Sequence, residues 1–354
     1  MVERRTFLKG LGAGVGTGAI AGCLGNGDSP SSTNEIDVLL TYFPEMVFSP
    51  VLAADEFGYF EEVGLDVNVD FTLSDTQLQQ VAQGEYDIVF DNPPAFLTGV
   101  AQGIPLELTH TIVGNPPLSY ASMGDSGIES FDDWSGTTVG IQNEPDRRWF
   151  TPAVLEEVGI DPNSFEQTTV GFEIQNVVQG SVDIMSLYPT NSDYASLNLA
   201  GEEFNLFEVR DHLNVPGNCS ITTENFLENN QDSVTEFVRA HARGMQDALD
   251  PSMEDEMIDL VLDALNEADA DVFVGDVDPR EVQSQNFERF LSYRPIDAWD
   301  SNGIGWSDPE AYQNTLDAGV AVGEIDESAD LDIDELVDNE LVNEVTDDNG
   351  DLDW

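Results

Sequence analysis

Residues Leu65–Phe90 read LDVNVDFTLSDTQLQQVAQGEYDIVF and contain a complete strand, helix and strand. Apolar and polar residues alternate over Leu65–Phe71, which is the pattern of a half-buried strand. A short helix is predicted for Thr76–Gln83, where Gly84 ends it, and Tyr86–Phe90 is an apolar run of strand length. Because strands joined by a helix usually pair in parallel, this stretch predicts an α/β fold.

The alternation continues on both sides of this stretch. Before it, the sequence predicts a strand at Ile36–Leu40 and a helix at Ser49–Phe60. After it come a predicted helix at Pro94–Gln102 and predicted strands at Leu106–Val113 and Ser119–Met123. These elements complete one lobe and lead out of it.

A second cycle of the same kind follows residue 130. Its predicted strands are Thr138–Ile141, Gln167–Val170 and Val182–Leu187, and its predicted helices are Trp149–Val158 and Ile174–Gln179. The strands Phe207–His212 and Ser220–Thr223 lead back, followed by helices at Gln231–Leu249, Met257–Asn266 and Leu331–Val345. We therefore predict one lobe from 35–122 and 218–345, a second from 123–217, and a disordered acidic tail at 346–354. Each lobe is a mainly parallel sheet flanked by helices, and the cleft between them is the expected ligand site.

The chain is strongly acidic. Of 354 residues, 70 are Asp or Glu and 11 are Lys or Arg, which gives a formal net charge of −59. Carboxylates spread along a chain keep it hydrated in concentrated salt, where charge repulsion is screened within roughly 3 Å at about 1 M. We interpret the composition as adaptation to a salty medium of the kind that haloarchaea inhabit. The same charge disfavours nucleic acid as a partner.

Residues 1–22 have the pattern of an export signal. Arg4 and Arg5 are placed as the twin-arginine route requires, and a short glycine-rich apolar stretch follows them. Ile20–Cys23 resembles a lipobox, whose cysteine carries the acyl chains, and residues 23–34 then form a flexible polar linker. We expect a protein anchored at the outer face of the cell membrane. The alternative is an ordinary secretory signal, and if Cys23 is lipidated, Cys219 is expected to be a small buried residue.

Short motifs occur in a fixed order along residues 36–345. They are Ala53–Val67 (AADEFGYFEEVGLDV), Val81–Asp87 (VAQGEYD), Ala101–Pro105 (AQGIP), Gly127–Gly136 (GIESFDDWSG) with Val139–Gly140, and Val178–Asp183 (VQGSVD). As an ordered set they resemble the substrate-binding proteins of ABC importers, in the group that binds aliphatic sulfonates, nitrate, taurine and thiamine precursors. The resemblance implies a periplasmic-binding-protein-like fold of type II and a small-molecule solute. It also implies a monomer that works with an ABC permease and its ATPase.

Within that group the chain is most similar to the thiamine-pyrimidine branch. In that branch the first strand is followed by an aromatic pair and a proline, which correspond to Tyr42–Pro44 of this chain. A strand of the second lobe is followed there by an aromatic residue, then Asn, any residue and Glu. The residues that roughly correspond to this second pattern are Tyr188, Asn191 and Asp193. The resemblance implies that these positions face the cleft. The branch has Asn and His where this chain has Glu45 and Phe48, so the match to the pyrimidine-binding pattern is incomplete.

Residues just past the predicted strand ends form the candidate ligand site. Those selected are Tyr42, Phe43, Glu45, Phe48, Asn92, Glu144, Arg147, Tyr188, Asn191 and Asp193, and Asp91, Arg148 and Trp149 lie in the same positions. This mixture of aromatic, amide and acidic groups suits a flat nitrogen heterocycle with amino groups. A small anion is the alternative, because Arg147 or Arg148 could hold a sulfonate through two parallel hydrogen bonds. The other interpretation of these arginines is ion pairing with nearby carboxylates such as Glu144, Asp146 or Glu156.

The sequence argues against an enzyme. The histidines His110, His212 and His241 lack metal-ligand spacing, so neither a metal nor a cofactor is predicted. The resembled family includes an enzyme that forms the thiamine pyrimidine from lysine-bound pyridoxal phosphate and a histidine. Lys9 is the only lysine of this chain and lies within the signal, so the exported protein has no lysine amine to form that Schiff base. We predict a binding protein, with an extracellular enzyme or a ligand sensor as the alternative.

Overall fold

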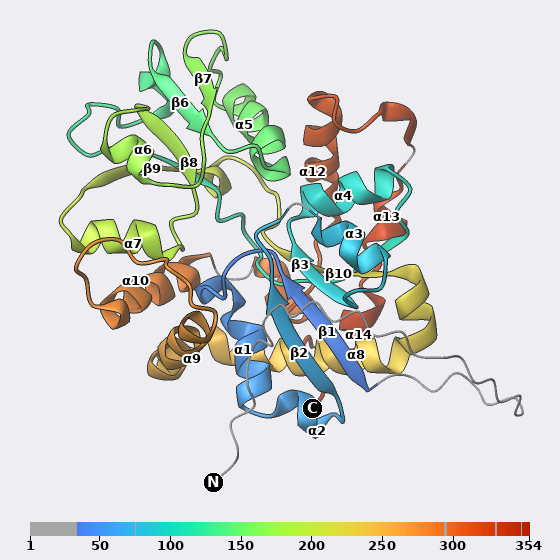
Figure 1. Ribbon diagram of the computed structural model, residues 1–354. Helices are drawn as coiled ribbons and strands as arrows, with labels where there is room; N and C mark the ends of the chain where they lie inside the picture. The colour runs from blue at the N-terminus through green and yellow to red at the C-terminus, as the bar shows by residue number, and fades with distance from the viewer. Residues whose placement is uncertain (1–33, 75, 294–295, 330, 348) are drawn as a thin grey trace, which may run out of the picture.

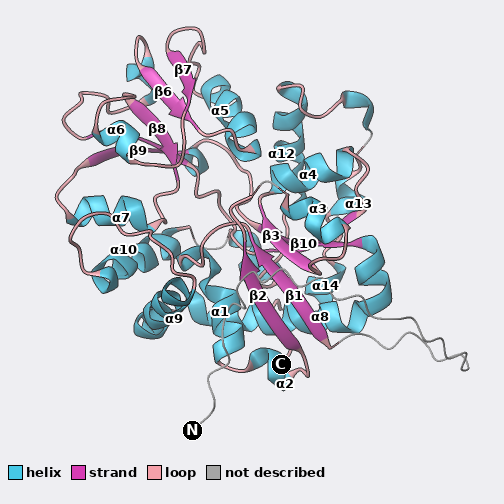
Figure 2. Ribbon diagram, in the orientation of Figure 1, coloured by secondary structure: helices cyan, strands magenta, loops and turns pink. Residues whose placement is uncertain are grey.

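The computed structural model describes residues 34–74, 76–293, 296–329, 331–347 and 349–354. The predicted signal with Arg4 and Arg5, the predicted lipidation site Cys23, and the linker up to residue 33 lie outside these residues. Within the described chain, two five-stranded sheets form the centres of two lobes (Figures 1 and 2). The predicted α/β class with two lobes is confirmed.

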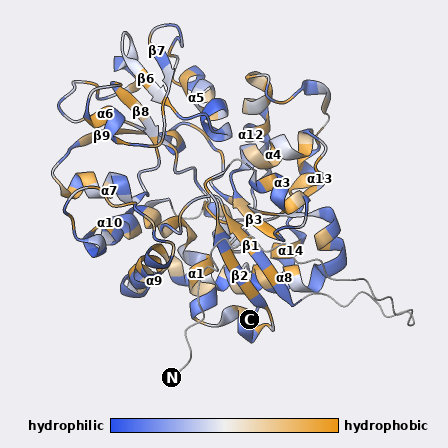
Figure 3. Ribbon diagram, in the orientation of Figure 1, coloured by the Kyte–Doolittle hydropathy of each residue, from blue (hydrophilic) through white to orange (hydrophobic). Residues whose placement is uncertain are grey.

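The sheet of the first lobe has the strand order β2-β1-β3-β10-β4. Its strands are β1 (Glu35–Leu40), β2 (Asp66–Phe71), β3 (Ile88–Asp91), β4 (Leu106–Thr111) and β10 (Cys219–Thr223). β1 is parallel to β2 and β3, so Val38 pairs with both Val69 and Ile88, while β10 runs antiparallel to β3 and β4. β3 is buried along its whole length, as expected for a strand covered by helices on both faces, whereas β2 alternates buried and exposed residues; Figure 3 shows the hydrophobic residues of these strands. Cys219 on β10 is fully buried, as predicted.

The sheet of the second lobe repeats this arrangement in the order β7-β6-β8-β5-β9. Its strands are β5 (Ser119–Met123), β6 (Thr138–Ile141), β7 (Glu166–Thr169), β8 (Ile184–Leu187) and β9 (Phe204–Glu208). β6 is parallel to β7 and β8, and β5 is antiparallel to β8 and β9. The strand predicted at Phe207–His212 is displaced, because Val209–Asp211 forms a 3-10 turn.

The chain leaves the first lobe earlier than predicted. β5 pairs only with strands of the second sheet, so the crossing precedes Ser119 and does not fall at residue 122. The return crossing lies between β9 and β10, near the predicted boundary at 217. A short strand gives no local signal of which sheet it joins, because either sheet would bury its apolar residues equally well.

Helices cover both sheets. They are α1 (Ser49–Glu56), α2 (Tyr59–Glu62), α3 (Gln77–Ala82), α4 (Pro93–Ala101), α5 (Pro145–Glu157), α6 (Gln175–Val178), α7 (Ser192–Leu199), α8 (Glu224–Ala248), α9 (Glu254–Glu267), α10 (Pro279–Ser292), α11 (Asp297–Asn302), α12 (Pro309–Ala321), α13 (Ile333–Leu336) and α14 (Glu340–Val345). The helix predicted at Ser49–Phe60 is two helices, because Gly58 has a φ of 79° between them. Among the described helices, none combines the length and the apolar composition that crossing a bilayer requires.

Two helices near the carboxyl terminus tie the lobes together. α10 packs on α9 of the first lobe and on α7 of the second, and α12 packs on α4 of the first lobe and on α5 of the second. Figure 1 shows both at the junction of the lobes, coloured orange and red. The lobes are therefore joined by packed helices as well as by the two crossing segments.

The acidic tail at 346–354, predicted to be disordered, is folded in its described part. Thr346 and Leu352 form a β-bridge. The Trp354 ring lies 4.2 Å from the Arg243 guanidinium carbon, and its centroid is 5.6 Å from that of Tyr59. The aromatic anchor and the cation–π contact explain why so acidic a segment is ordered.

Candidate ligand-binding cleft

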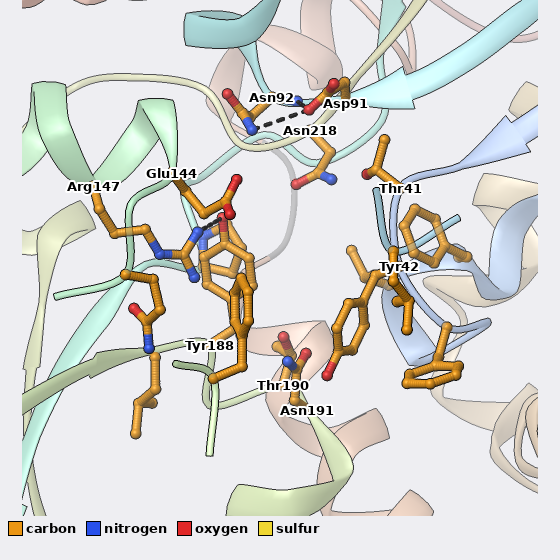
Figure 4. Close-up of a pocket in the computed structure, with 18 of the residues that line it drawn as sticks. Thr41, Tyr42, Asp91, Asn92, Glu144, Arg147, Tyr188, Thr190, Asn191 and Asn218 are labelled. Atoms are coloured by element: carbon orange, nitrogen blue, oxygen red, sulfur yellow. Dashed lines mark hydrogen bonds between the residues drawn. The ribbon is translucent and has the colours of Figure 1, made fainter. Parts of the chain in front are cut away.

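A cavity of about 300 Å³ lies between the two lobes (Figure 4). Its walls begin where parallel strands end: β1 and β3 in the first lobe, β6 and β8 in the second. The carboxyl ends of parallel strands are the usual ligand position in such sheets, since the loops that follow them converge there. The volume is at the lower end of the range for small-molecule sites.

The structure brings nearly all of the predicted ligand residues together. Those that line the cavity are Tyr42, Phe43, Phe48, Asn92, Glu144, Arg147, Tyr188, Asn191 and Asp193. Their contact with a ligand stays a prediction. Of the other residues past strand ends, Asp91 lines the cavity too, whereas Arg148 bonds Glu324 at 3.0 Å outside it and Trp149 is fully buried in the core.

Aromatic rings face the cavity from both lobes. Figure 4 shows Tyr42 of the first lobe and Tyr188 of the second on opposite sides of the space. The Tyr42 ring is packed against Phe43, with centroids 5.3 Å apart, and against Phe172 of the second lobe at 6.4 Å. A flat ring system placed between the two tyrosines would contact both lobes at once.

Tyr188 is fixed from behind by a buried ion pair. Arg147 donates to both carboxylate oxygens of Asp146 at 2.9 Å and to the Tyr188 hydroxyl at 2.8 Å. The hydroxyl in turn donates to Asp146 at 2.6 Å, and the guanidinium carbon lies 4.1 Å from the Tyr188 ring centroid. Burial and the Asp146 charge hold the pKa of Tyr188 well above its ordinary value, so the hydroxyl stays protonated. The charge of Arg147 is thereby already matched by a carboxylate, as one of the two sequence interpretations proposed.

Two buried carboxyl groups, Asp91 and Asp193, lie on opposite walls of the cavity. Asp91 is 3% exposed and accepts from Gln77 Nε2 at 2.9 Å, from the Asn92 backbone N–H at 2.7 Å and from Asn92 Nδ2 at 3.0 Å. On the opposite wall, Asp193 accepts from the Tyr194 backbone N–H at 2.8 Å. Burial raises the pKa of Asp91 to about 7 and that of Asp193 to about 6. Neither carboxyl group forms an ion pair within the described chain. A ligand that carries a positive charge or donates N–H groups would therefore stabilise the ionised forms of both.

Glu45 is the predicted ligand residue that the structure places elsewhere. It is 1% exposed and does not line the cavity. Its carboxylate instead accepts from the backbone N–H and hydroxyl of Ser192. Glu45 therefore connects the two lobes beside the cavity.

Sequence reasoning missed several lining residues. The missed side chains are Thr41, Val47, Leu73, Ser74, Gln77, Pro117, Gln142, Phe172, Leu187, Thr190 and Asn218. Thr41 and Gln142 directly follow β1 and β6 and could have been found by the strand-end rule. Phe172 and Asn218 lie in irregular loops, and only the fold brings them to the cleft.

Residues 45–254 match the family model described as NMT1/THI5 like. The chain is 25% identical over 313 residues to the riboflavin-binding protein RibY of Chloroflexus aurantiacus, which covers 87% of this chain and 86% of that protein. It is 26% identical over 233 residues to the formylaminopyrimidine-binding protein of Halalkalibacterium halodurans, covering 64% and 70%. It is 23% identical over 225 residues to the 4-amino-5-hydroxymethyl-2-methylpyrimidine phosphate synthase of Legionella pneumophila, covering 60% and 69%. Binding proteins and synthases are thus both among its relatives.

Solved structures show the same fold. The periplasmic nitrate-binding protein NrtA of Synechocystis PCC 6803 superposes with a TM-score of 0.67 at 13% identity, over 90% of this chain and 89% of that one. The periplasmic aliphatic sulphonate binding protein SsuA of Escherichia coli gives 0.64 at 14% identity, over 86% and 98%. The predicted type II periplasmic-binding-protein fold is confirmed.

Proposed function

Because the chain belongs to the NMT1/THI5-like family, we propose that it is the solute-binding component of an ABC importer and that its ligand is a flat nitrogen heterocycle. The observation that carries the proposal is the pair of opposed tyrosines, Tyr42 and Tyr188, in a cavity whose polar side chains include several amides and carboxylates. Rings stack between aromatic side chains, while amino and ring N–H groups donate to the carboxylates. RibY and the formylaminopyrimidine-binding protein are named for ligands of this chemical class.

The charge of the cavity favours a heterocycle over a small anion. Asp91, Glu144 and Asp193 line it, and among the described lining residues the only basic one is Arg147, which is already paired with Asp146. A sulfonate or nitrate would be brought close to Asp91 and Asp193, neither of which forms an ion pair within the described chain. A ligand that donates hydrogen bonds, or carries a positive charge, would reduce that repulsion.

The second part of the proposal is that the protein binds its ligand without converting it to a product. Among the described residues that line the cavity there is no lysine and no histidine. His110 and His241 are buried against each other in the first lobe, and His212 packs against Phe131. The synthase chemistry that depends on lysine-bound pyridoxal phosphate and a histidine therefore has neither of these residues in the described cavity lining. Quantitative recovery of unchanged ligand after long incubation would support binding alone, and appearance of a product would contradict it.

Ligand screening tests the proposed class. Thermal unfolding in concentrated KCl is measured with riboflavin, a formylaminopyrimidine, an alkanesulfonate, nitrate and taurine. A true ligand at about a thousandfold excess over its dissociation constant should stabilise the protein by about 4 kcal/mol. We expect stabilisation by a heterocycle, and stabilisation by the anions alone would contradict the proposal.

A pair of matched variants sharpens this screen. Asp91→Asn removes one carboxylate from the cavity wall, and Glu267→Gln makes the same charge change at an exposed position of α9. Loss of a hydrogen bond to a charged group should weaken heterocycle binding roughly tenfold in the first variant and leave it unchanged in the second. Equal effects would mean that overall charge, rather than the cavity wall, governs affinity.

The proposal includes anchoring at the outer face of the cell membrane after twin-arginine export, in a salty medium. Arg4, Arg5 and Cys23 support it through their sequence pattern, and a tethered receptor stays near its permease. Cys23→Ser should move the protein from the membrane fraction to the medium, whereas Cys219→Ser, which alters the other cysteine, should leave it bound. Membrane association of Cys23→Ser in high salt would contradict the lipid anchor.

A further inference from the structure

A buried polar cluster joins the two lobes beside the cavity. Glu45, in the loop after β1, accepts from the Ser192 backbone N–H at 3.2 Å and from its hydroxyl at 2.7 Å. Gln283 and Asn286 of α10 donate to the same hydroxyl oxygen at 2.7 and 3.3 Å. All four residues are at most 1% exposed. Three residues that belong to the first lobe or pack on it therefore converge on the first residue of α7 in the second lobe.

The Ser192 hydroxyl is fully used in this cluster. It donates once, to Glu45, and accepts twice, from Gln283 and Asn286, which is the complete capacity of a hydroxyl group. A buried site of this kind is sensitive to the loss of one member, because the others are left without a partner and without water.

Both ends of the cluster adjoin residues of the cavity wall. Tyr42 and Phe43 precede Glu45 by a few residues, and Asn191 and Asp193 flank Ser192 on both sides. The position of these two ligand-facing loops relative to each other is consequently coupled to the contact between Glu45 and Ser192.

We propose that Glu45 and Ser192 form a contact that holds the second lobe closed on the first, and that Glu45 is a positioning residue for ligand capture. Opening of the lobes requires this contact to break, so its strength contributes to the balance between open and closed forms. The effect on ligands rests on the proposed binding function, whereas the contact between the lobes does not.

Glu45 is the titratable member of the contact. Burial raises the pKa of Glu45 to about 7, hydrogen bonds from Ser192 and Gln283 lower it, and Asp193 on α7 raises it. The Ser192 backbone N–H and hydroxyl both donate to this carboxyl, and the hydroxyl oxygen already accepts twice, so neither group can accept a proton from Glu45. The observed contact is therefore that of an ionised carboxylate.

The first test uses two serines of the same helix. Ser192→Ala removes the hydroxyl that joins the lobes, and Ser196→Ala removes a buried hydroxyl that bonds only the Ser192 carbonyl within α7. Without ligand, small-angle scattering should give Ser192→Ala a larger radius of gyration than the wild type, and hydrogen exchange at the start of α7 should be faster. With riboflavin as probe, its dissociation should be roughly tenfold faster. Equal behaviour of the two variants would overturn the proposal.

The second test changes the acceptor. Glu45→Gln keeps the size of the side chain but offers one acceptor oxygen where the carboxylate offers two, so it cannot offer a separate oxygen to each donor of Ser192. We expect Glu45→Gln at pH 8 to have a larger radius of gyration without ligand than the wild type. A radius of gyration equal to that of the wild type would overturn the role of Glu45. If scattering and exchange behave as expected but neither riboflavin nor a formylaminopyrimidine binds, the contact stands and the proposed function fails.

Discussion

At the scale of single residues, Tyr188 offers the sharpest test of the cavity. Asp146 and Arg147 hold its hydroxyl, while its ring faces Tyr42 across the cavity. Tyr188→Ala should weaken riboflavin binding at least tenfold, because loss of a stacking partner costs about 1 kcal/mol beyond the contact area that is lost with it. Tyr188→Phe keeps the ring, so it should retain most of the affinity and lower the free energy of unfolding by about 1 kcal/mol.

Calorimetric titration and urea unfolding distinguish these two effects. Equal loss of affinity in Tyr188→Phe and Tyr188→Ala would show that the hydroxyl, and not the ring, contacts the ligand.

Glu45 shows why the site could be predicted only in part. Position after a strand end is a consequence of topology, so Tyr42 and Asn92 could be placed at the cleft from sequence. The direction of a side chain within a loop depends on its tertiary contacts, and Glu45 accepts hydrogen bonds from Ser192 instead of lining the cavity. The sequence indicated Asp146 as one of several carboxylates that could pair with Arg147, and only the structure shows that this pair lies beneath Tyr188 and holds its hydroxyl.

A second residue-scale prediction concerns the buried histidine pair. His110 Nε2 and His241 Nδ1 are 2.6 Å apart, and both side chains are 1% exposed. Burial lowers the pKa of His110 to about 3, and burial together with His110 lowers the pKa of His241 well below its ordinary value. Because the unfolded chain binds protons that the folded chain excludes, these residues destabilise the fold increasingly as the pH falls below about 6.5.

A comparison of variants separates the effect of the histidine pair on acid stability from the effect of the carboxyl groups. His241→Phe should be less stable than the wild type at pH 8, because His110 loses its hydrogen-bond partner. That deficit should shrink by about 2 kcal/mol at pH 5, where the wild type carries the cost of an unprotonated His241. Val238→Ala, a buried apolar change on the same helix, should show the same deficit at both pH values. Parallel pH curves for His241→Phe and the wild type would contradict the prediction.

At the scale of elements, apolar periodicity predicted most strands and several of the helices that cover them, such as α8 and α9, but it missed α12. α10 was missed because its buried face includes Gln283 and Asn286 beside Val282 and Phe287, which interrupts the apolar repeat. α7 was missed for the same reason, since Ser192 and Ser196 are buried in it. These polar positions are the ones that join the lobes, so the elements hardest to predict are those that carry the inter-lobe contact.

The packing of α8 against α1 gives an element-scale prediction. A Cβ atom built on Gly244 would lie 2.1 Å from the Pro50 carbonyl oxygen, which belongs to the backbone of α1 and cannot move alone. Gly244→Ala should therefore destabilise the protein by about 1 to 3 kcal/mol in urea unfolding, although alanine favours helices. Gln246→Ala at an exposed position of the same helix should be nearly neutral. A stabilised Gly244→Ala would show that α1 and α8 separate without cost.

At the scale of the whole molecule, the net charge of −59 makes folding dependent on salt. Compaction brings the carboxylates together, and their repulsion is screened over about 10 Å at 0.1 M salt and about 3 Å at 1 M. The unfolding temperature should therefore rise steeply with KCl at low concentration and level off near about 1 M, once the screening length is shorter than the spacing of surface charges. Differential scanning calorimetry in KCl and in NaCl at equal ionic strength measures the curve. A rise that continues linearly beyond that concentration, or differs between the two salts, would assign the effect to exclusion of salt from the protein surface instead of screening.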